Sequence, residues 1–250
     1  MTRRRFYAPP QAFAADKVVT LGADESQHLR NVLRLKTGDE VYIFDGAGRE
    51  FRGAVDRLSR IATYIQVTEE VGPAAAESPL QLTMAVALLK GEKFDLVIQK
   101  LTELGVNCIV PLMTKRADVR IRNYDDADRK LIRWRRIVME ATKQCGRARL
   151  MTITSPITFD EFVTSPHAEG ERVMFAERGG AQLRTVVAGQ TTSAQATALV
   201  GSEGGWTDDE INQARGAGWQ IITLGGRIMR AETAAIACAA LLQHQFGDLI

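Results

Sequence analysis

The sequence predicts an α/β protein with two domains, a small N-terminal β-barrel and a larger domain built on a mostly parallel sheet. Short strand-like runs separated by turns fill the first part of the chain, whereas strand-like and helix-like runs alternate in the second. A segment rich in Pro, Ala and Ser separates the two patterns. We therefore expect a barrel at 1–72, a linker at 73–79 and an α/β domain at 80–250.

The N-terminal barrel is predicted from a hairpin and a further strand. Residues with high strand propensity flank Gly46, Ala47 and Gly48, which is a typical hairpin signal. A run at 61–71 alternates polar and apolar residues, as expected of a strand with one buried face. Together these strands form the expected small barrel.

The larger domain is predicted from the order of its elements. Strands are expected at 80–89, 107–113, 172–177, 196–202 and 219–225. Helices are expected at 92–105, where apolar residues recur at helical spacing, at 125–145, which is long and basic, and at 231–246, which is rich in Ala. Because helices separate most of the strands, the sheet is expected to be mostly parallel.

Composition excludes several classes of protein. With 45% hydrophobic and 25% charged residues, the chain is typical of a globular protein. Cys108, Cys145 and Cys238 lie far apart and form no CxxC pair, which argues against a zinc site or a disulfide framework and fits a reducing cytoplasm. The basic N-terminus lacks the apolar core of a signal peptide, and no run of apolar residues is long enough to predict a membrane span.

Basic charge is concentrated in two segments. Residues 115–149 hold twelve lysines and arginines against five acids, although the net charge of the whole chain is only +2. The first 36 residues show a weaker bias of the same sign. A single charged helix is often only a solvated surface, but two basic segments favour a site for nucleic acid.

Two glycine-rich turns indicate a ligand site. "LVGSEGGWTDDE" (199–210) and "ITLGGRIMRAETA" (222–234) each follow a strand and lead into a helix, and Thr207 with Glu210 has the spacing of a capping box. Neither a P-loop nor a GxGxxG motif is present. Ligands of parallel sheets bind beyond the carboxyl ends of the strands, so the two turns are expected to line one pocket. The alternative is that the glycines only permit tight turns.

These two turns resemble the cofactor-binding end of the SPOUT methyltransferases. The similarity is greatest to the RsmE branch, the 16S ribosomal RNA uridine N3-methyltransferases, and "HLRNVLRLKTGDEVYIFDGAG", "LLKGEKFDLVIQKLTELGV" and "RWRRIVMEATKQCGRA" also resemble that branch. The resemblance spans almost the whole chain. Met229 and Ala231 depart from the usual Leu and Thr of the family.

The resemblance implies a C-terminal SPOUT domain with a deep trefoil knot and an N-terminal PUA-like barrel that binds RNA. It further implies a homodimer, no metal, and S-adenosylmethionine bound within the knot. The cofactor-binding residues expected from the turns and the resemblance are Phe175, Glu177, Leu199, Gly201, Glu203, Gly204, Gly205, Leu224, Gly225, Ile228, Met229, Arg230, Thr233 and Ala234. A valine at Gly204 is expected to block cofactor binding while the fold survives.

Methylation of uracil at N3 requires loss of the N3 proton, so the enzyme is expected to stabilise negative charge on the uracil oxygens. Arg230 in the second turn is the expected cation, and Arg147 is the next candidate. An ion pair between Arg230 and Glu232 that only stabilises the fold is the alternative. Glu232 lies where the helix dipole favours a carboxylate, and is not expected to be the base.

RNA contacts are expected from the two basic segments. Glu140, Gln144 and Arg147 share one helix face, which also fits a contact between helices or subunits. The expected RNA-binding residues are Arg3, Arg4, Arg5, His28, Arg30, Arg34, Arg133, Arg136, Gln144 and Arg147. The leading function is methylation of 16S ribosomal RNA in the small subunit. A SPOUT enzyme with another RNA target, such as a ribose 2′-oxygen or a transfer RNA base, and a non-catalytic RNA-binding protein remain alternatives.

Overall fold

The computed structural model of the chain describes residues 3–59, 61–166, 170–186 and 194–249. The chain divides into two compact units, one of residues 1–77 with 139–150 and the other of residues 78–138 with 151–250. The first break falls within the segment expected to be the linker. Residues 139–150, expected in the α/β domain, instead pack with the N-terminal unit.

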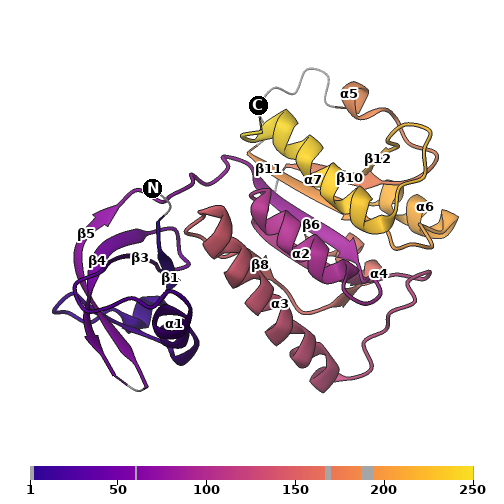
Figure 1. The fold of residues 1–250 in the computed structure, drawn as a ribbon. Coiled ribbons are helices and arrows are strands. Elements are labelled where there is room, and N and C mark those ends of the chain that lie inside the picture. The colour runs from indigo at the N-terminus through magenta and orange to yellow at the C-terminus, as the bar shows by residue number, and fades with distance from the viewer. Residues whose placement is uncertain (1–2, 60, 167–169, 187–193, 250) are drawn as a thin grey trace. The chain divides into compact units, whose positions relative to one another are not determined.

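The N-terminal unit is built on a five-stranded sheet with the order β1-β3-β4-β5-β2 (Figure 1). The strands and short helices are β1 (Arg5–Tyr7), η1 (Pro10–Ala12), β2 (Val18–Leu21), α1 (Ala23–Gln27), η2 (His28–Val32), β3 (Glu40–Phe44), β4 (Glu50–Leu58) and β5 (Thr63–Val71). The predicted hairpin is confirmed, because β3 and β4 pair antiparallel. Phe6, Leu29, Val41 and Ile65 lie in the apolar core of this unit.

Arg5 joins this sheet to the end of helix α3 (Tyr124–Cys145). Its guanidinium pairs with Glu50 at 2.9 Å and donates to the backbone carbonyls of Thr142, Lys143 and Arg147 at 3.0, 2.9 and 2.6 Å. The last carbonyls of a helix lack partners within it, so Arg5 satisfies groups that would otherwise be unpaired. The residue is 7% exposed, and this burial does not fit the predicted contact between Arg5 and RNA.

Arg147 is the second buried arginine of this unit. It is 3% exposed and pairs with Glu77 at 2.7 Å. Lys143 likewise pairs with Glu25 at 2.6 Å, so two ion pairs, together with the hydrogen bonds from Arg5, tie the segment 139–150 to earlier parts of the chain. The burial of Arg147 does not fit its predicted roles in catalysis and RNA binding, because a guanidinium held in this way has little access to a substrate.

The C-terminal unit contains a seven-stranded sheet whose paired strands are all parallel, in the order β12-β10-β11-β6-β7-β8 with β9 also pairing with β7. Its strands are β6 (Gln81–Ala87), β7 (Cys108–Met113), β8 (Thr152–Ile153), β9 (Ile157–Thr158), β10 (Glu171–Phe175), β11 (Gln195–Val200) and β12 (Gln220–Ile222). The first strand of this unit, β6, lies in the interior of the sheet, and the strand order reverses beside it. Such a reversal is where open α/β sheets bind ligands.

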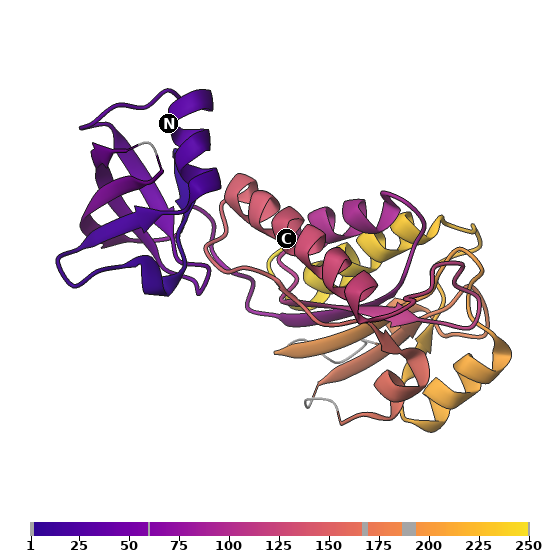
Figure 2. The ribbon, with the colours of Figure 1, turned by 90° about the horizontal axis from the view of Figure 1, so that it is seen from below.

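Helices cover both faces of this sheet. Figure 2 shows α2, α3 and α7 on one face and α4 and α6 on the other. The helices of this unit, besides α3, are α2 (Lys93–Glu103), α4 (Phe159–Thr164), α5 (Leu183–Val186), α6 (Asp208–Gly216) and α7 (Ala231–Phe246). Within the described residues, no helix has the length and apolar character needed to cross a membrane.

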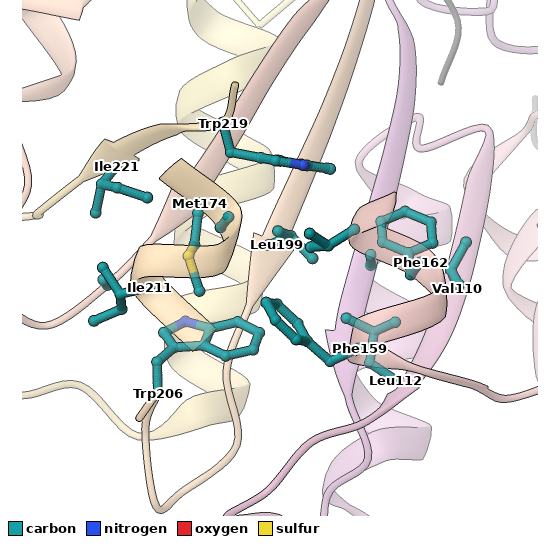
Figure 3. Close-up of a cluster of buried hydrophobic side chains, with 14 residues drawn as sticks. Val110, Leu112, Phe159, Phe162, Met174, Leu199, Trp206, Ile211, Trp219 and Ile221 are labelled. Carbon is teal, nitrogen blue, oxygen red and sulfur yellow. The ribbon is translucent and has the colours of Figure 1, made fainter. Parts of the chain in front are cut away.

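A buried cluster rich in aromatic residues anchors the loop after β11 (Figure 3). Trp206 is 1% exposed and its ring centroid lies 5.2 Å from that of Phe159. Its indole Nε1 donates to the carbonyl of Phe175 at 2.9 Å. The predicted capping box follows at once, with Thr207 and Glu210 bonded to each other's backbone N–H groups. A core residue and a helix cap therefore fix the end of this loop.

Candidate functional site

The carboxyl ends of β10, β11 and β12 and the start of α7 surround a cavity of about 320 Å³. This volume lies within the usual range of small-molecule sites. The cavity is lined by Phe175, Ala176, Glu177, Val200, Gly201, Ser202, Glu203, Gly204, Gly205, Trp206, Thr223, Leu224, Gly225, Gly226, Arg227, Ile228, Met229, Ala231, Ala234 and Cys238. Both glycine turns contribute, so the expectation that they share one pocket is met.

Eleven of the fourteen predicted cofactor residues line this cavity, and Leu199, Arg230 and Thr233 do not. Leu199 is fully buried in the core beneath the loop. Sequence reasoning missed several lining residues, of which Ala231 and Cys238 had a usable signal. Together with Ala234 they recur at helical spacing along one face of α7.

The first glycine turn (201–206) is packed closely against the protein. A Cβ at Gly204 would lie 2.8 Å from the Cβ of Arg116 and 2.9 Å from its carbonyl oxygen. Gly205 has a φ of +64°, and a Cβ there would lie 2.6 Å from a carboxylate oxygen of Glu177. The need for glycine at these positions therefore arises within the protein. At Gly204 a larger residue would therefore strain the protein itself, and the expectation that the fold survives a valine there stays a prediction.

Two arginines from other loops hold the same turn. Arg116 donates to the carbonyls of Gly204 and Trp206 at 3.2 and 3.1 Å. Arg178 donates to the carbonyl of Trp206 at 3.2 Å and pairs with Asp208 at 2.7 Å. The sequence offered no signal for these contacts, because the bonded residues lie between 28 and 90 positions apart.

The second glycine turn (223–230) is open. Apart from its chain neighbours, a Cβ at Gly225 or Gly226 would have no atom of the described residues within 4 Å, and Ile228 is 93% exposed. Arg230 is exposed at the N-cap of α7, and within the described part of the chain its guanidinium has no hydrogen bond or ion pair. The alternative pairing of Arg230 with Glu232 is absent there, because the cation near Glu232 is Lys93 at 3.9 Å.

One polar side chain in the cavity wall has unused bonding capacity. Ser202 is 7% exposed, and its hydroxyl oxygen is buried without a hydrogen-bond partner among the described residues. Buried hydroxyls are normally paired, so this oxygen is a candidate contact for a bound ligand. Across the described ranges, no cluster of His, Cys, Asp and Glu could hold a metal ion.

The predicted RNA-binding residues do not form one group. On α3, Arg133, Arg136 and Gln144 are exposed, and Arg133 pairs with Asp95 of α2. In the N-terminal unit, Arg4 and Arg34 are exposed, whereas other predicted residues make contacts within the protein.

The contacts of those other residues are local. Arg3 pairs with Glu50 at 2.9 Å and lies over the ring of Tyr42. Arg30 donates to the carbonyl of Ser59 at 2.6 Å, and His28 packs edge-on against Phe6. Arg4, Arg34 and the exposed face of α3 are thus the strongest candidates for RNA contacts.

Comparison with known proteins agrees with this architecture. Residues 76–243 match an RNA methyltransferase domain, and residues 21–67 match an RNA methyltransferase PUA domain. The ribosomal RNA small subunit methyltransferase E of Synechocystis is 34% identical over 243 residues, which cover 96% of this chain and 77% of the relative. This chain belongs to the ribosomal RNA small subunit methyltransferase E family.

Two solved structures show the same fold over their full length. A methyltransferase E from Neisseria gonorrhoeae, bound to S-adenosylmethionine, has a TM-score of 0.89 and 31% identity, with 100% of both chains covered. A protein from Legionella pneumophila, solved with the same cofactor, has a TM-score of 0.91 and 30% identity, again with 100% of both chains covered. The methyltransferase E fold therefore extends over the whole chain.

Proposed function

We propose that this protein transfers a methyl group from S-adenosylmethionine to N3 of a uridine in 16S ribosomal RNA. The observation that carries the proposal is the cavity formed by the two glycine turns, in a chain that belongs to the methyltransferase E family. Relatives of the same fold are bound to this cofactor.

The residues of the cavity fit S-adenosylmethionine. Phe175, Met229 and Ala234 offer apolar surface, while the turns offer backbone groups for the polar parts of the cofactor. The buried hydroxyl of Ser202 supplies an unused polar contact. When bound, the cofactor supplies a methyl group that is activated for transfer by the positive sulfur. The trefoil knot implied by the resemblance remains a prediction.

Arg230 is the residue that we assign to the uracil. Deprotonation of N3 leaves negative charge shared with the flanking carbonyl oxygens, and a cation already in place lowers the free energy of that anion. Arg230 is exposed beside the cavity at the start of α7, where the helix dipole adds positive potential. Its lack of a partner within the described residues leaves the guanidinium able to donate to a substrate.

RNA binding is assigned to the exposed cations. Arg135 and Arg136 lie on the exposed side of α3, and Arg4 and Arg34 are exposed in the N-terminal unit. Phosphate contacts release counterions, so each one adds about one unit to the slope of log affinity against log salt. We further propose a homodimer that acts in the cytoplasm on the small ribosomal subunit. The partly exposed alanines of α7, Ala234, Ala237 and Ala240, offer a surface for close packing of a second copy.

A methyl-transfer assay tests the proposal. The protein is incubated with labelled S-adenosylmethionine and either 16S ribosomal RNA or small subunits from cells lacking the protein, and the product nucleoside is identified by mass spectrometry. We expect 3-methyluridine. A methylated ribose or transfer RNA would point to another target, and cofactor binding without transfer to any RNA would point to a non-catalytic protein. Sedimentation of an active monomer would contradict the dimer.

A further inference from the structure

The segment "LLKGEK" (88–93) is part of the family resemblance, but the proposed mechanism gives it no role. It forms the turn between β6 and α2 and ends at Lys93, the first residue of α2. The Nζ atom of Lys93 lies 2.9 Å from Oε1 of Glu203 and 3.9 Å from Oε2 of Glu232. One ammonium group therefore lies between two carboxylates.

The two carboxylates come from the two elements that form different parts of the cavity lining, although only Glu203 lines the cavity itself. Glu203 lines the cavity within the first glycine turn. Glu232 follows the cavity-lining Ala231 in the first turn of α7, directly after the second glycine turn. Lys93 lies on a third element and does not itself line the cavity. Its charge is thus placed to act on both walls without contacting a ligand there.

The burial of Glu232 makes the cation important there, whereas the side chains of Lys93 and Glu203 are 36% and 30% exposed. The side chain of Glu232 is 13% exposed, and its Oε2 atom has no hydrogen bond within the described residues. At 3.9 Å the attraction to Lys93 is electrostatic, since a hydrogen bond would need a distance near 2.9 Å. Without Lys93, the carboxylates of Glu203 and Glu232 would face each other with no cation between them, and two like charges so close together repel.

Glu203 is held in its charged form by the same segment. Burial acts to raise the pKa of Glu203, but the hydrogen bond from Lys93, a hydrogen bond from the backbone of Glu203 itself, the charge of Lys93 and a hydrogen bond from the backbone of Lys90 outweigh it and leave the pKa below its usual value. Lys90 is itself paired with Asp118 at 2.8 Å on the outer surface. Of these two lysines, Lys93 is therefore the one that pairs with the carboxylates of Glu203 and Glu232.

We propose that Lys93 is a positioning residue that holds the two walls of the cofactor cavity together. This inference rests on the proposed function, because it concerns affinity for S-adenosylmethionine. Loss of the cation allows Glu203 and Glu232 to move apart and widens the cavity. The charge, rather than the bulk of the side chain, sets the separation of the two glycine turns.

Calorimetry with S-adenosylmethionine tests this role. We expect Lys93→Met to raise the dissociation constant about tenfold, which is typical for loss of a charged hydrogen bond. Lys93→Arg should recover most of the affinity. Lys93→Met combined with Glu203→Gln should bind more tightly than Lys93→Met alone, because one of the two repelling charges is gone. Lys100→Met is the matched control, since Lys100 lies on the same helix and, among the residues that the structure describes, pairs only with Glu103 at 2.9 Å.

The outcomes separate the inference from the proposed function. A wild-type protein that does not bind the cofactor would overturn the proposed function. Wild-type binding with unchanged affinity in Lys93→Met would overturn only the role of Lys93, and so would additive losses in the double variant. If Lys93→Met fails to fold, Lys93→Gln and the Glu203→Gln single and double variants give the same comparison. A drop in melting temperature without a change in affinity would assign Lys93 to stability alone and contradict the inference.

Discussion

The two glycine turns each hold a Gly-Gly pair between a strand and a helix, but they have very different surroundings. The first turn packs against Arg116 and Glu177 and is anchored by the buried Trp206. The second has open space around Gly225 and Gly226 and carries the exposed Ile228. The first turn thus provides a rigid wall, whereas the second presents its side chains to whatever binds. A glycine pattern alone does not distinguish these roles, because both permit a tight turn.

The largest expected effect concerns Arg230 in the open turn. Arg230→Ala should lower the single-turnover rate of methyl transfer by ~10²–10³, the usual loss for one preorganised donor to a developing anion. Arg230→Lys should recover only part, because an ammonium cannot reproduce the planar guanidinium contact. Rates at saturating cofactor and RNA isolate this step from binding.

Two outcomes would alter the role of Arg230. A normal single-turnover rate in Arg230→Ala, combined with weak cofactor binding, would assign Arg230 to cofactor binding rather than to catalysis. The second turn would then have a structural role like that of the first. Raising the pH should partly rescue Arg230→Ala, because more uracil is deprotonated at N3 in solution. No rescue would mean that the guanidinium does not act on this charge.

A matched pair of glycines tests the difference in packing. Gly204 and Gly226 both line the cavity, and neither has a positive φ. Gly204→Ala forces a methyl group against the backbone of Arg116 and should cost about 1–3 kcal/mol of unfolding free energy. Gly226→Ala places its methyl group in open space, so stability should be unchanged or slightly higher.

The same pair separates folding from binding. Urea unfolding measures stability, and calorimetry measures affinity for S-adenosylmethionine. Gly226→Ala should weaken cofactor binding while leaving the unfolding midpoint in place, because the space it fills belongs to the ligand. Equal stability losses in the two variants would show that the two turns are packed alike and would remove the contrast between them.

Local signals predicted most of the elements of the fold. Helix α7 (Ala231–Phe246) matches the predicted range, and the capping box of α6 was visible as Thr207 and Glu210. A second capping box at Thr158 and Glu161 begins α4 and had the same signal, although that helix was not predicted. Helices and strands with periodic apolar residues or a capping motif can be predicted, because residues close together in the sequence form them.

The role of each arginine was far less predictable. Arg5 and Arg147 belong to the basic segments that favour nucleic acid, yet both are buried against Glu50 and Glu77. Their partners are 45 and 70 positions away, so composition cannot distinguish a buried pair from an exposed cluster. The hydrogen bonds from Arg116 and Arg178 to the first glycine turn could not be predicted for the same reason. Charge clusters in sequence indicate a site only when the fold leaves them exposed.

Trp206 provides a further test of the anchored turn. Trp206→Phe keeps an aromatic ring in the core but removes the indole N–H that donates to Phe175. Leaving that buried carbonyl without its partner should cost about 1–3 kcal/mol of unfolding free energy and should weaken cofactor binding. Urea unfolding monitored by circular dichroism measures the loss, because the substitution itself changes the tryptophan fluorescence. A stable variant with full affinity would show that the packing of α6 alone holds the turn.

The smallest expected effect concerns Arg116, whose side chain donates hydrogen bonds to the same turn. Arg116→Met removes donors to the carbonyls of Gly204 and Trp206, but Arg178 still donates to Trp206. Arg116 is exposed, and water can replace it at Gly204, so the loss of stability should be about 0.5 kcal/mol. Lys115→Met is the control, because Lys115 makes an exposed ion pair with Asp209 at 3.4 Å. If Arg116→Met destabilises the protein as much as Gly204→Ala, the first turn depends on its hydrogen bonds to Arg116 rather than on its close packing. The two turns would then differ in their hydrogen bonds and not in their packing.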